Sequence, residues 1–244
     1  MLAFHGFDRD CNDFKVFATS LGTKYRIISF DLFCHGQTPM PEDDRALTPD
    51  DLEDIITKYL EENKINKFSL LGHSVGGKIV LSCIELFGEY VKDVFLFAPY
   101  GVRENKWIRR FQNWKPAQWL FKYAVNNPGL FFALIHLLHR VWLITETQHD
   151  FLYFQMGTPE RRKKMYAIWK LLRLIEPDIS EIKRIVNRYA ISMNLFYGEF
   201  DPIEPRENGF YLVKRMSNKN IRIMEDMGHN LINETTNEVL KEYI

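Results

Sequence analysis

The sequence predicts an α/β protein, with a mostly parallel central sheet flanked by helices and interrupted once by a long helical insertion. Two observations carry this prediction. Short apolar runs alternate with helix-like patterns up to Gly101, and the alternation resumes near Tyr189, whereas the residues between them contain helix-like patterns and no convincing strand. Each apolar run is nearly continuous, which is typical of strands that are covered on both faces.

The individual elements follow from local patterns. The expected strands are Tyr25–Phe30, Phe68–Leu71, Val94–Phe97, Ile191–Tyr197 and Ile221–Met224. Thr48 followed by Pro49 indicates the start of a helix, because a threonine caps the free N–H groups and proline suits the first helical position. Further helices are expected over Pro205–Met216 and Leu231–Ile244.

Composition excludes several classes of protein. Of the 244 residues, 46% are hydrophobic and 26% charged, which is ordinary for a soluble globular protein, and the 32 basic and 32 acidic residues cancel. A zero net charge gives no reason to expect a nucleic-acid partner. Three widely separated cysteines fit neither a disulfide framework nor a metal site. Because no signal peptide or membrane-spanning run is visible, we expect a cytoplasmic protein.

The strongest local signal surrounds Ser74. An apolar run ends in Gly72-His73-Ser74-Val75-Gly76, and a helical pattern begins at once. A Gly-x-Ser-x-Gly turn between a strand and a helix is the arrangement that exposes a serine nucleophile at a helix N-terminus, where backbone N–H groups favour a developing negative charge.

Two other interpretations of this turn are open. It could be a glycine-rich turn without chemistry. It also matches most of a phosphate-binding loop, Gly-x-x-x-x-Gly-Lys, ending in Gly77-Lys78. That pattern fails at Ile79, where a magnesium-binding loop needs a serine or threonine.

The choice between these interpretations depends on partners later in the chain. Asp201 comes just after the run Ile191–Tyr197, and His229 comes just after the run Ile221–Met224. Serine, then acid, then histidine is the order of a catalytic triad on an open parallel sheet, where such groups gather at the carboxyl ends of strands. The order therefore favours Ser74 as nucleophile, His229 as general base and Asp201 as the group that orients the histidine.

With these motifs in place, the chain resembles the α/β-hydrolase superfamily over its whole length outside the insertion. Five motifs carry the resemblance, in family order: His5-Gly6-Phe7, Asp31–Thr38, Gly72–Gly76, Gly198–Pro205 and Gly228–Glu234. The resemblance implies an oxyanion hole made by the backbone N–H groups of Phe7 and Val75. It implies no metal or organic cofactor, and its supporting residues are His5, Gly6, Gly72, His73 and Gly76.

Two features depart from the family pattern. Cys34 stands in place of the usual glycine and Thr38 in place of the usual serine, changes that a loop can absorb. Met1 stands almost on the third strand of the family fold, so we expect a sheet that lacks the first two strands.

The expected domains are a core of residues 1–100 and 190–244 and a helical cap, or lid, of residues 101–189. All five tryptophans lie in the cap, and residues 101–190 carry 16 Lys and Arg against 7 Asp and Glu. The aromatic residues either form the small core of the cap or line an apolar tunnel for substrate. A third interpretation is weak peripheral contact with lipid surfaces.

These expectations combine into a serine hydrolase that cleaves an ester, or a related acyl bond, of a small to medium apolar substrate through an acyl-enzyme. A carbon–carbon bond hydrolase acting on a β-diketone-like substrate uses similar groups and is an alternative. A catalytically silent ligand-binding member of the superfamily is a second alternative. The expected partner is a small-molecule acyl substrate, and oligomeric state is left open.

Overall fold

The computed structural model describes residues 1–40, 45–103, 110 and 112–243. The chain divides into two compact units. The first, the sheet unit, comprises residues Met1–Thr38, Thr48–Arg103 and Ile175–Ile244. The second, the helical unit, comprises Pro39–Leu47 and Glu104–Leu174.

The sheet unit contains a six-stranded sheet with strand order β2-β1-β3-β4-β5-β6, in which every neighbouring pair is parallel. Its strands are β1 Leu2–Phe4, β2 Ile28–Phe30, β3 Phe68–His73, β4 Val91–Phe97, β5 Ser192–Gly198 and β6 Lys219–Met224. The predicted parallel sheet is therefore confirmed. Because all strands run the same way, the loops that follow them meet at one edge of the sheet.

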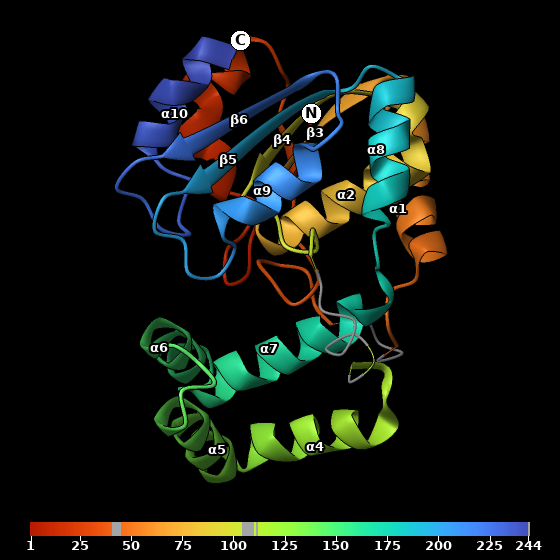
Figure 1. Cartoon of the computed structure of the whole chain (residues 1–244). Coiled ribbons are helices and arrows are strands. Elements are labelled where there is room, and N and C mark those ends of the chain that lie inside the picture. Colours follow the sequence, from red (N-terminus) through yellow and green to blue (C-terminus); the bar gives the residue numbers. More distant parts are fainter. Residues whose placement is uncertain (41–44, 104–109, 111, 244) are drawn as a thin grey trace. The chain divides into compact units, whose positions relative to one another are not determined.

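Helices cover both faces of this sheet. One layer contains α1 Pro49–Glu62, α2 Val75–Phe87, α8 Ile179–Arg188 and α9 Arg206–Val213 (Figure 1). The other face carries the 3₁₀ helix η1 Asp13–Thr19 and α10 Glu234–Leu240. The remaining 3₁₀ turns of this unit are η2 Leu21–Thr23, η3 Gly88–Tyr90 and η5 Lys241–Tyr243. Asn237 Nδ2 donates to Thr19 Oγ1 over 2.7 Å and so joins α10 to the end of η1.

The centre of the sheet is an aromatic and aliphatic core. Phe97 of β4 stacks on Phe17 of η1, with ring centroids 5.3 Å apart, and on Phe196 of β5 at 4.8 Å. All three side chains are inaccessible to solvent. Their burial holds β4 and β5 in place, and with them the loops that leave their carboxyl ends.

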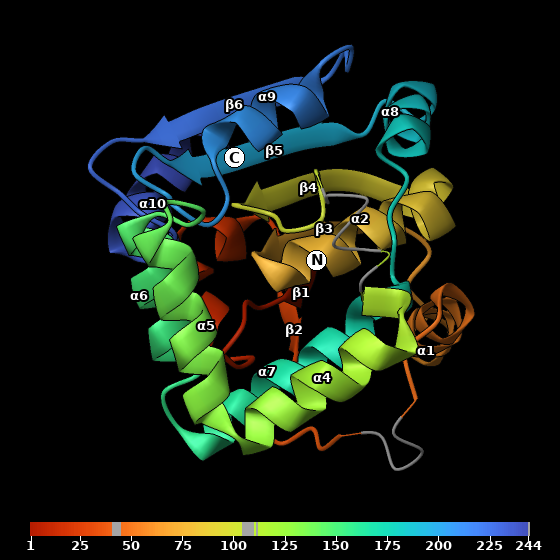
Figure 2. The same ribbon diagram turned by 60° about the horizontal axis from the view of Figure 1, so that its bottom comes forward.

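In its described residues, the helical unit contains α4 Lys115–Asn126, α5 Pro128–Arg140, α6 Glu146–Gln155, α7 Pro159–Leu171 and η4 Leu172–Leu174. Helix α4 packs against α7 and α5, and α5 packs against α6, as the view in Figure 2 shows. Phe121 and Trp169 meet edge to face at 4.9 Å between α4 and α7. Within the described parts of the chain, every helix is too short or too polar to cross a lipid bilayer.

A buried arginine ties the ends of these helices together. Arg162, which is 8% exposed, donates from Nε to the carbonyl of Val125 and from Nη1 to the carbonyl of Met156. These carbonyls lie at the C-terminal ends of α4 and α6, where a positive charge is favourable. The basic run 161–164 therefore includes a structural cation beside the exposed Lys163.

The unit boundaries differ from the expected division at 101–189. Helix α8 belongs to the sheet unit, because Ile182 and Val186 are buried where it packs on α2. Residues 39–47 belong to the helical unit, where the Leu47 N–H donates to the Leu171 carbonyl over 2.8 Å. An amphipathic pattern shows that a helix has a buried face, but it does not identify the surface that covers it.

The capping of α1 makes a testable contribution to stability. Thr48 Oγ1 accepts from the Asp51 N–H over 3.1 Å, and Asp51 Oδ2 accepts from the Thr48 N–H over 2.8 Å. Thr48→Ala removes one bond of this pair and is expected to lower the free energy of unfolding by about 1 kcal/mol. Urea unfolding measures it, with Lys58→Ala, at an exposed position in the middle of α1, as control. Equal stability of the two variants would contradict the role of the cap.

Candidate active site

Ser74 occupies the turn between β3 and α2 with a backbone conformation that non-glycine residues rarely adopt, φ 50° and ψ −117°. The turn is held by three backbone hydrogen bonds. The Ser74 N–H donates to the Phe97 carbonyl over 2.9 Å, and its carbonyl accepts from the N–H groups of Gly77 and Tyr100, each at 2.9 Å. Strain of this kind costs about 1–3 kcal/mol and persists only where the surroundings enforce it.

Two glycines make the turn sterically feasible. A Cβ atom at Gly76 would lie 2.0 Å from the Phe4 carbonyl oxygen, and one at Gly72 would lie 2.9 Å from the Gly76 oxygen. Neither contact is compatible with a side chain. The Gly-x-Ser-x-Gly spacing thus reflects the close approach of β1, β3 and the first turn of α2.

The structure brings Ser74, His229 and Asp201 together, although they are far apart in the sequence. His229 Nε2 lies 2.8 Å from Ser74 Oγ, and His229 Nδ1 lies 2.7 Å from Asp201 Oδ2. The three residues follow β3, β6 and β5, so they meet at the carboxyl edge of the sheet. The Asp201 side chain is fully buried, while 19% of the His229 side chain is exposed.

The surroundings of Asp201 set the direction of these hydrogen bonds. Its Oδ1 accepts from the N–H groups of Ile203 at 2.8 Å and Glu204 at 3.0 Å, which leaves Oδ2 to accept from His229. A carboxylate that accepts from Nδ1 assigns the proton of a neutral imidazole to that nitrogen. His229 Nε2 then carries the lone pair and accepts from the Ser74 hydroxyl.

His73 directly precedes the serine and is buried beside His229. Among the described residues, no hydrogen bond joins its ring to Ser74 Oγ. Its Nε2 lies 3.1 Å from the His229 carbonyl oxygen, so Nε2–H donates and fixes the backbone of the second histidine. Burial, and next the charge of His229, lowers the pKa of His73 to about 3. His73 is therefore neutral at ordinary pH and serves as a fixed donor.

Phe7 and Val75, whose N–H groups are expected to form an oxyanion hole, follow β1 and β3 respectively. Val75 is the first residue of α2, and the leading N–H groups of a helix have no acceptor within it. Phe7 follows the turn after β1, where His5 Nδ1–H donates to the Gly6 carbonyl over 2.8 Å and His5 Nε2 accepts from the Leu32 N–H over 3.1 Å. His5 thus fastens the β1 loop to the β2 loop.

The loop after β2 is held by a second histidine. The Asp8 N–H donates to His35 Nε2 over 3.2 Å, and His35 Nδ1 lies 3.0 Å from the Phe33 carbonyl oxygen. The rings of His5 and His35 meet edge to face at 4.9 Å. Both histidines thus bind backbone groups of these loops.

Two residues near the site, Glu204 and Tyr197, were given no role by sequence reasoning. Glu204 is 6% exposed beside Asp201, and the buried hydroxyl of Tyr197 has no hydrogen-bond partner among the described residues. Burial, and next the charges of Glu204 and Asp201, raises the pKa of Tyr197. Lys78, the lysine of the phosphate-loop alternative, is 2% exposed with Nζ 5.4 Å from the Tyr100 ring centroid, so it is not presented to a phosphate.

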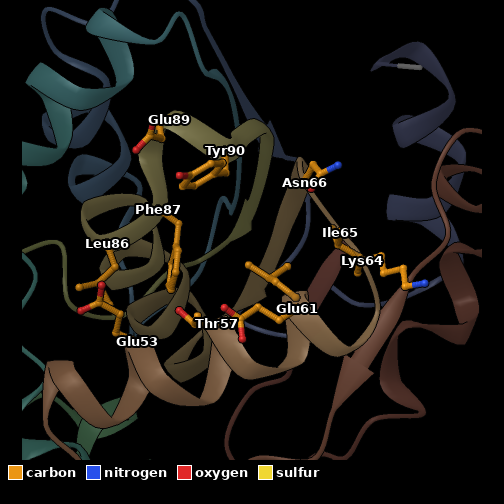
Figure 3. Close-up of a pocket in the computed structure, with 11 residues that line it drawn as sticks. Glu53, Thr57, Glu61, Lys64, Ile65, Asn66, Leu86, Phe87, Glu89 and Tyr90 are labelled. Carbon is orange, nitrogen blue, oxygen red and sulfur yellow. The ribbon is translucent and has the colours of Figure 1, made fainter.

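A pocket of about 710 Å³ lies elsewhere on the sheet unit, and Figure 3 shows it between α1 and the end of α2. Thr57 and Glu61 of α1 form one side, and Phe87 and Tyr90 form the other. Since α2 begins beside Ser74 and ends at Phe87, this pocket is at the opposite end of the helix from the triad. We do not assign it to the chemistry of Ser74.

A family model described as serine aminopeptidase, S33 matches residues 1–236. The chain belongs to this family. Together with the six-stranded parallel sheet, the match establishes the predicted α/β-hydrolase fold and identifies the chain as a member of a family of hydrolases.

Two curated relatives of this S33 family member carry hydrolase names. The uncharacterized hydrolase YugF of Bacillus subtilis (strain 168) is 28% identical over 250 residues, covering 100% of this chain and 88% of the relative. The probable lysophospholipase BODYGUARD 1 of Arabidopsis thaliana is 28% identical over 244 residues, covering 88% of this chain and 50% of the relative. The chain thus spans about half the length of the plant protein.

Solved structures share the fold at low identity. A thermophilic esterase from Thermogutta terrifontis superposes with a TM-score of 0.67 at 15% identity, covering 99% of this chain and 88% of the other. The meta-cleavage product hydrolase CumD from Pseudomonas fluorescens IP01 gives 0.64 at 17% identity, covering 99% and 89%. At these identities the likeness concerns the fold.

The glycine at position 76 gives a direct test of the turn. Gly76→Ala places a Cβ against the Phe4 carbonyl and is expected to lower the free energy of unfolding by about 1–3 kcal/mol. Gly129→Ala is the matched control, because a Cβ there meets nothing within 4 Å. Urea unfolding compares the two variants. A Gly76→Ala protein as stable as the control would contradict the close approach.

The buried His73 predicts a pH dependence of stability. Its pKa is about 3 in the folded state and about 6.5 in an unfolded chain, so between these values the unfolded state binds the additional proton. Stability must therefore fall as the pH falls from about 6.5 toward 3.

We expect His73→Gln to lose stability less steeply on acidification than the wild type, as measured by urea unfolding at neutral and acidic pH. His136→Gln, at an exposed histidine, is the control and should keep the wild-type slope. Parallel slopes for wild type and His73→Gln would show that His73 is not buried in its neutral form.

Proposed function

We propose that this chain is a serine hydrolase that cleaves an ester, or a related acyl bond, of a small to medium and largely apolar substrate. The single observation that carries the proposal is the chain of hydrogen bonds from Ser74 Oγ through His229 to Asp201, with lengths of 2.8 and 2.7 Å. In this chain the Ser74 hydroxyl donates to His229 Nε2, and His229 Nδ1–H donates to the buried Asp201 carboxylate. Nucleophilic catalysis by serine needs both hydrogen bonds in these directions.

The first half of the reaction acylates the serine. Ser74 Oγ forms a bond to the substrate carbonyl carbon while its proton passes to His229 Nε2. The carbonyl oxygen becomes an oxyanion, which the N–H groups of Phe7 and Val75 stabilise. When the tetrahedral intermediate collapses, the bond to the leaving group breaks, and that group takes the proton from His229.

The second half returns the enzyme to its starting state. His229 Nε2 removes a proton from water as the water oxygen attacks the acyl carbon. The intermediate then expels Ser74 Oγ, which regains its proton from His229, and the carboxylic acid product leaves. Asp201 keeps the Nδ1 proton in place throughout and stabilises the imidazolium form of the histidine.

The proposed substrate class has two supports. The names of the Arabidopsis relatives describe lysophospholipases, whose reaction is ester hydrolysis. The larger segment of the helical unit, Glu104–Leu174, is inserted after β4 and contains all five tryptophans of the chain. We propose that it serves as the cap that supplies apolar surface to the acyl group.

Ser74→Ala is expected to abolish covalent labelling by a fluorophosphonate probe, because the probe reacts with the activated hydroxyl. The wild type should be labelled, and labelling should be followed by in-gel fluorescence or intact mass. Equal labelling of both proteins would show that Ser74 is not the nucleophile. Absence of labelling in both would support the silent ligand-binding alternative.

Asp201→Asn is expected to lower kcat by about 10⁴-fold, because an amide at this position shifts the histidine proton to Nε2, where it blocks acceptance from Ser74. Asp226→Asn, an exposed aspartate on the loop of His229, is the matched control and should keep wild-type kcat. Hydrolysis of a chromogenic ester measures both variants. Similar kcat values would contradict the role of Asp201.

Substrate choice separates the ester proposal from carbon–carbon cleavage. A panel of p-nitrophenyl esters of increasing chain length, together with one β-diketone, is expected to give turnover of esters and a kcat/KM that rises with apolar chain length. Turnover of the diketone alone would replace the ester proposal with the carbon–carbon alternative.

A further inference from the structure

Helix α5 of the helical unit exposes a continuous apolar stripe. Leu130, Leu134, Leu137 and Val141 follow one another at spacings of four, three and four residues, which places them on one face of a helix. Each is at least 50% exposed. A helix stripe with this spacing is normally buried, and within the helical unit no described side chain covers it.

The stripe continues into the residues after α5. Trp142 is 93% exposed and Leu143 is 70% exposed. They are held by the backbone, since the Trp142 N–H donates to the His139 carbonyl over 3.0 Å and the Leu143 N–H donates to the Leu138 carbonyl over 2.9 Å. Trp142 also has a positive φ of 59°, a conformation usually given to glycine at a helix end. A large aromatic side chain is thus presented to the surroundings at a strained position.

Leu130, Leu134, Leu137, Val141, Trp142 and Leu143 together are called the α5 face. The helical unit that carries this face has an excess of cations, since residues 104–174 contain 12 Lys and Arg against 4 Asp and Glu. Arg140 at the end of α5 is exposed, and α6, which packs against α5, exposes Glu146 and Asp150. An exposed apolar face on a basic unit fits a surface that is both apolar and negatively charged.

The same charges argue against a second copy of this chain as the occupant. A two-fold interface on the α5 face would bring together two units that each have 12 Lys and Arg against 4 Asp and Glu over residues 104–174. An anionic lipid surface has the complementary charge, and its interfacial region accommodates tryptophan.

We propose that the α5 face docks on the surface of an anionic lipid bilayer. The 13 residues of α5 are too few to cross a membrane, which takes about 20, so the helix lies in the plane of the interface. Leu130, Leu134 and Leu137 enter the acyl boundary, and Trp142 anchors the end of the helix. This docking is independent of the chemistry proposed for Ser74, because it requires no turnover.

The test is binding to lipid vesicles by co-sedimentation. The probes are vesicles of phosphatidylcholine alone and vesicles in which phosphatidylglycerol replaces about a third of it. The wild type is expected to bind the anionic vesicles, to bind phosphatidylcholine vesicles much less, and to lose binding in high salt. Trp142→Ser combined with Leu143→Ser should weaken binding by about tenfold or more, since both side chains bury their apolar surface on docking.

Matched controls keep the outcome specific. Phe210→Ser removes an exposed aromatic side chain from α9 in the sheet unit, and it should bind vesicles as the wild type does. Ser74→Ala should also bind normally, which separates docking from catalysis. Circular dichroism checks that each variant is folded, and substitution at such exposed positions should leave the fold intact.

Three results would overturn the proposal. The first is a wild type that binds neither kind of vesicle. The second is equal binding by the wild type and the Trp142/Leu143 double variant, which would locate the contact elsewhere. The third is a wild-type dimer in light scattering that the double variant converts to monomer without any vesicle binding, which would assign the α5 face to a second copy.

Discussion

The backbone contact between β1, β3 and the start of α2 is the constraint on which the candidate site depends. Gly76 lies so close to the Phe4 carbonyl that no side chain fits between them, and this approach holds Ser74 in its unusual conformation. The turn can be maintained because the sheet on both sides is buried and hydrogen-bonded. A loose loop would relax to an ordinary conformation and withdraw the hydroxyl from His229.

Hydrogen bonds from side chains to backbone groups hold the loops of the site to one another. His73 fixes the carbonyl of His229, and His5 joins the loop after β1 to the loop after β2. Asp201 is held by the N–H groups of its own loop. Hydrogen bonds to neighbouring groups thus hold His229 and Asp201 in place, which is the preorganisation that catalysis by fixed dipoles requires.

The two units solve different physical problems. The sheet unit buries its large aromatic residues between β4, β5 and η1. The helical unit has no sheet to cover, so it buries aliphatic residues such as Ile168 and Leu171 together with Arg162, while a stripe of large apolar residues stays exposed on α5. The two units also differ in charge, since the insertion is strongly basic although the whole chain is neutral.

The sequence by itself determined the class of fold and the order of the site residues, because continuous apolar runs and a glycine-flanked serine are local signals. It could not assign α8 to the sheet unit, since Ile182 and Val186 would be buried equally well against any apolar partner. Only the tertiary structure decided that His73 binds the His229 carbonyl and that Arg162 is buried at two helix ends. These contacts join residues that are distant in the chain, and no local pattern records which distant groups will meet.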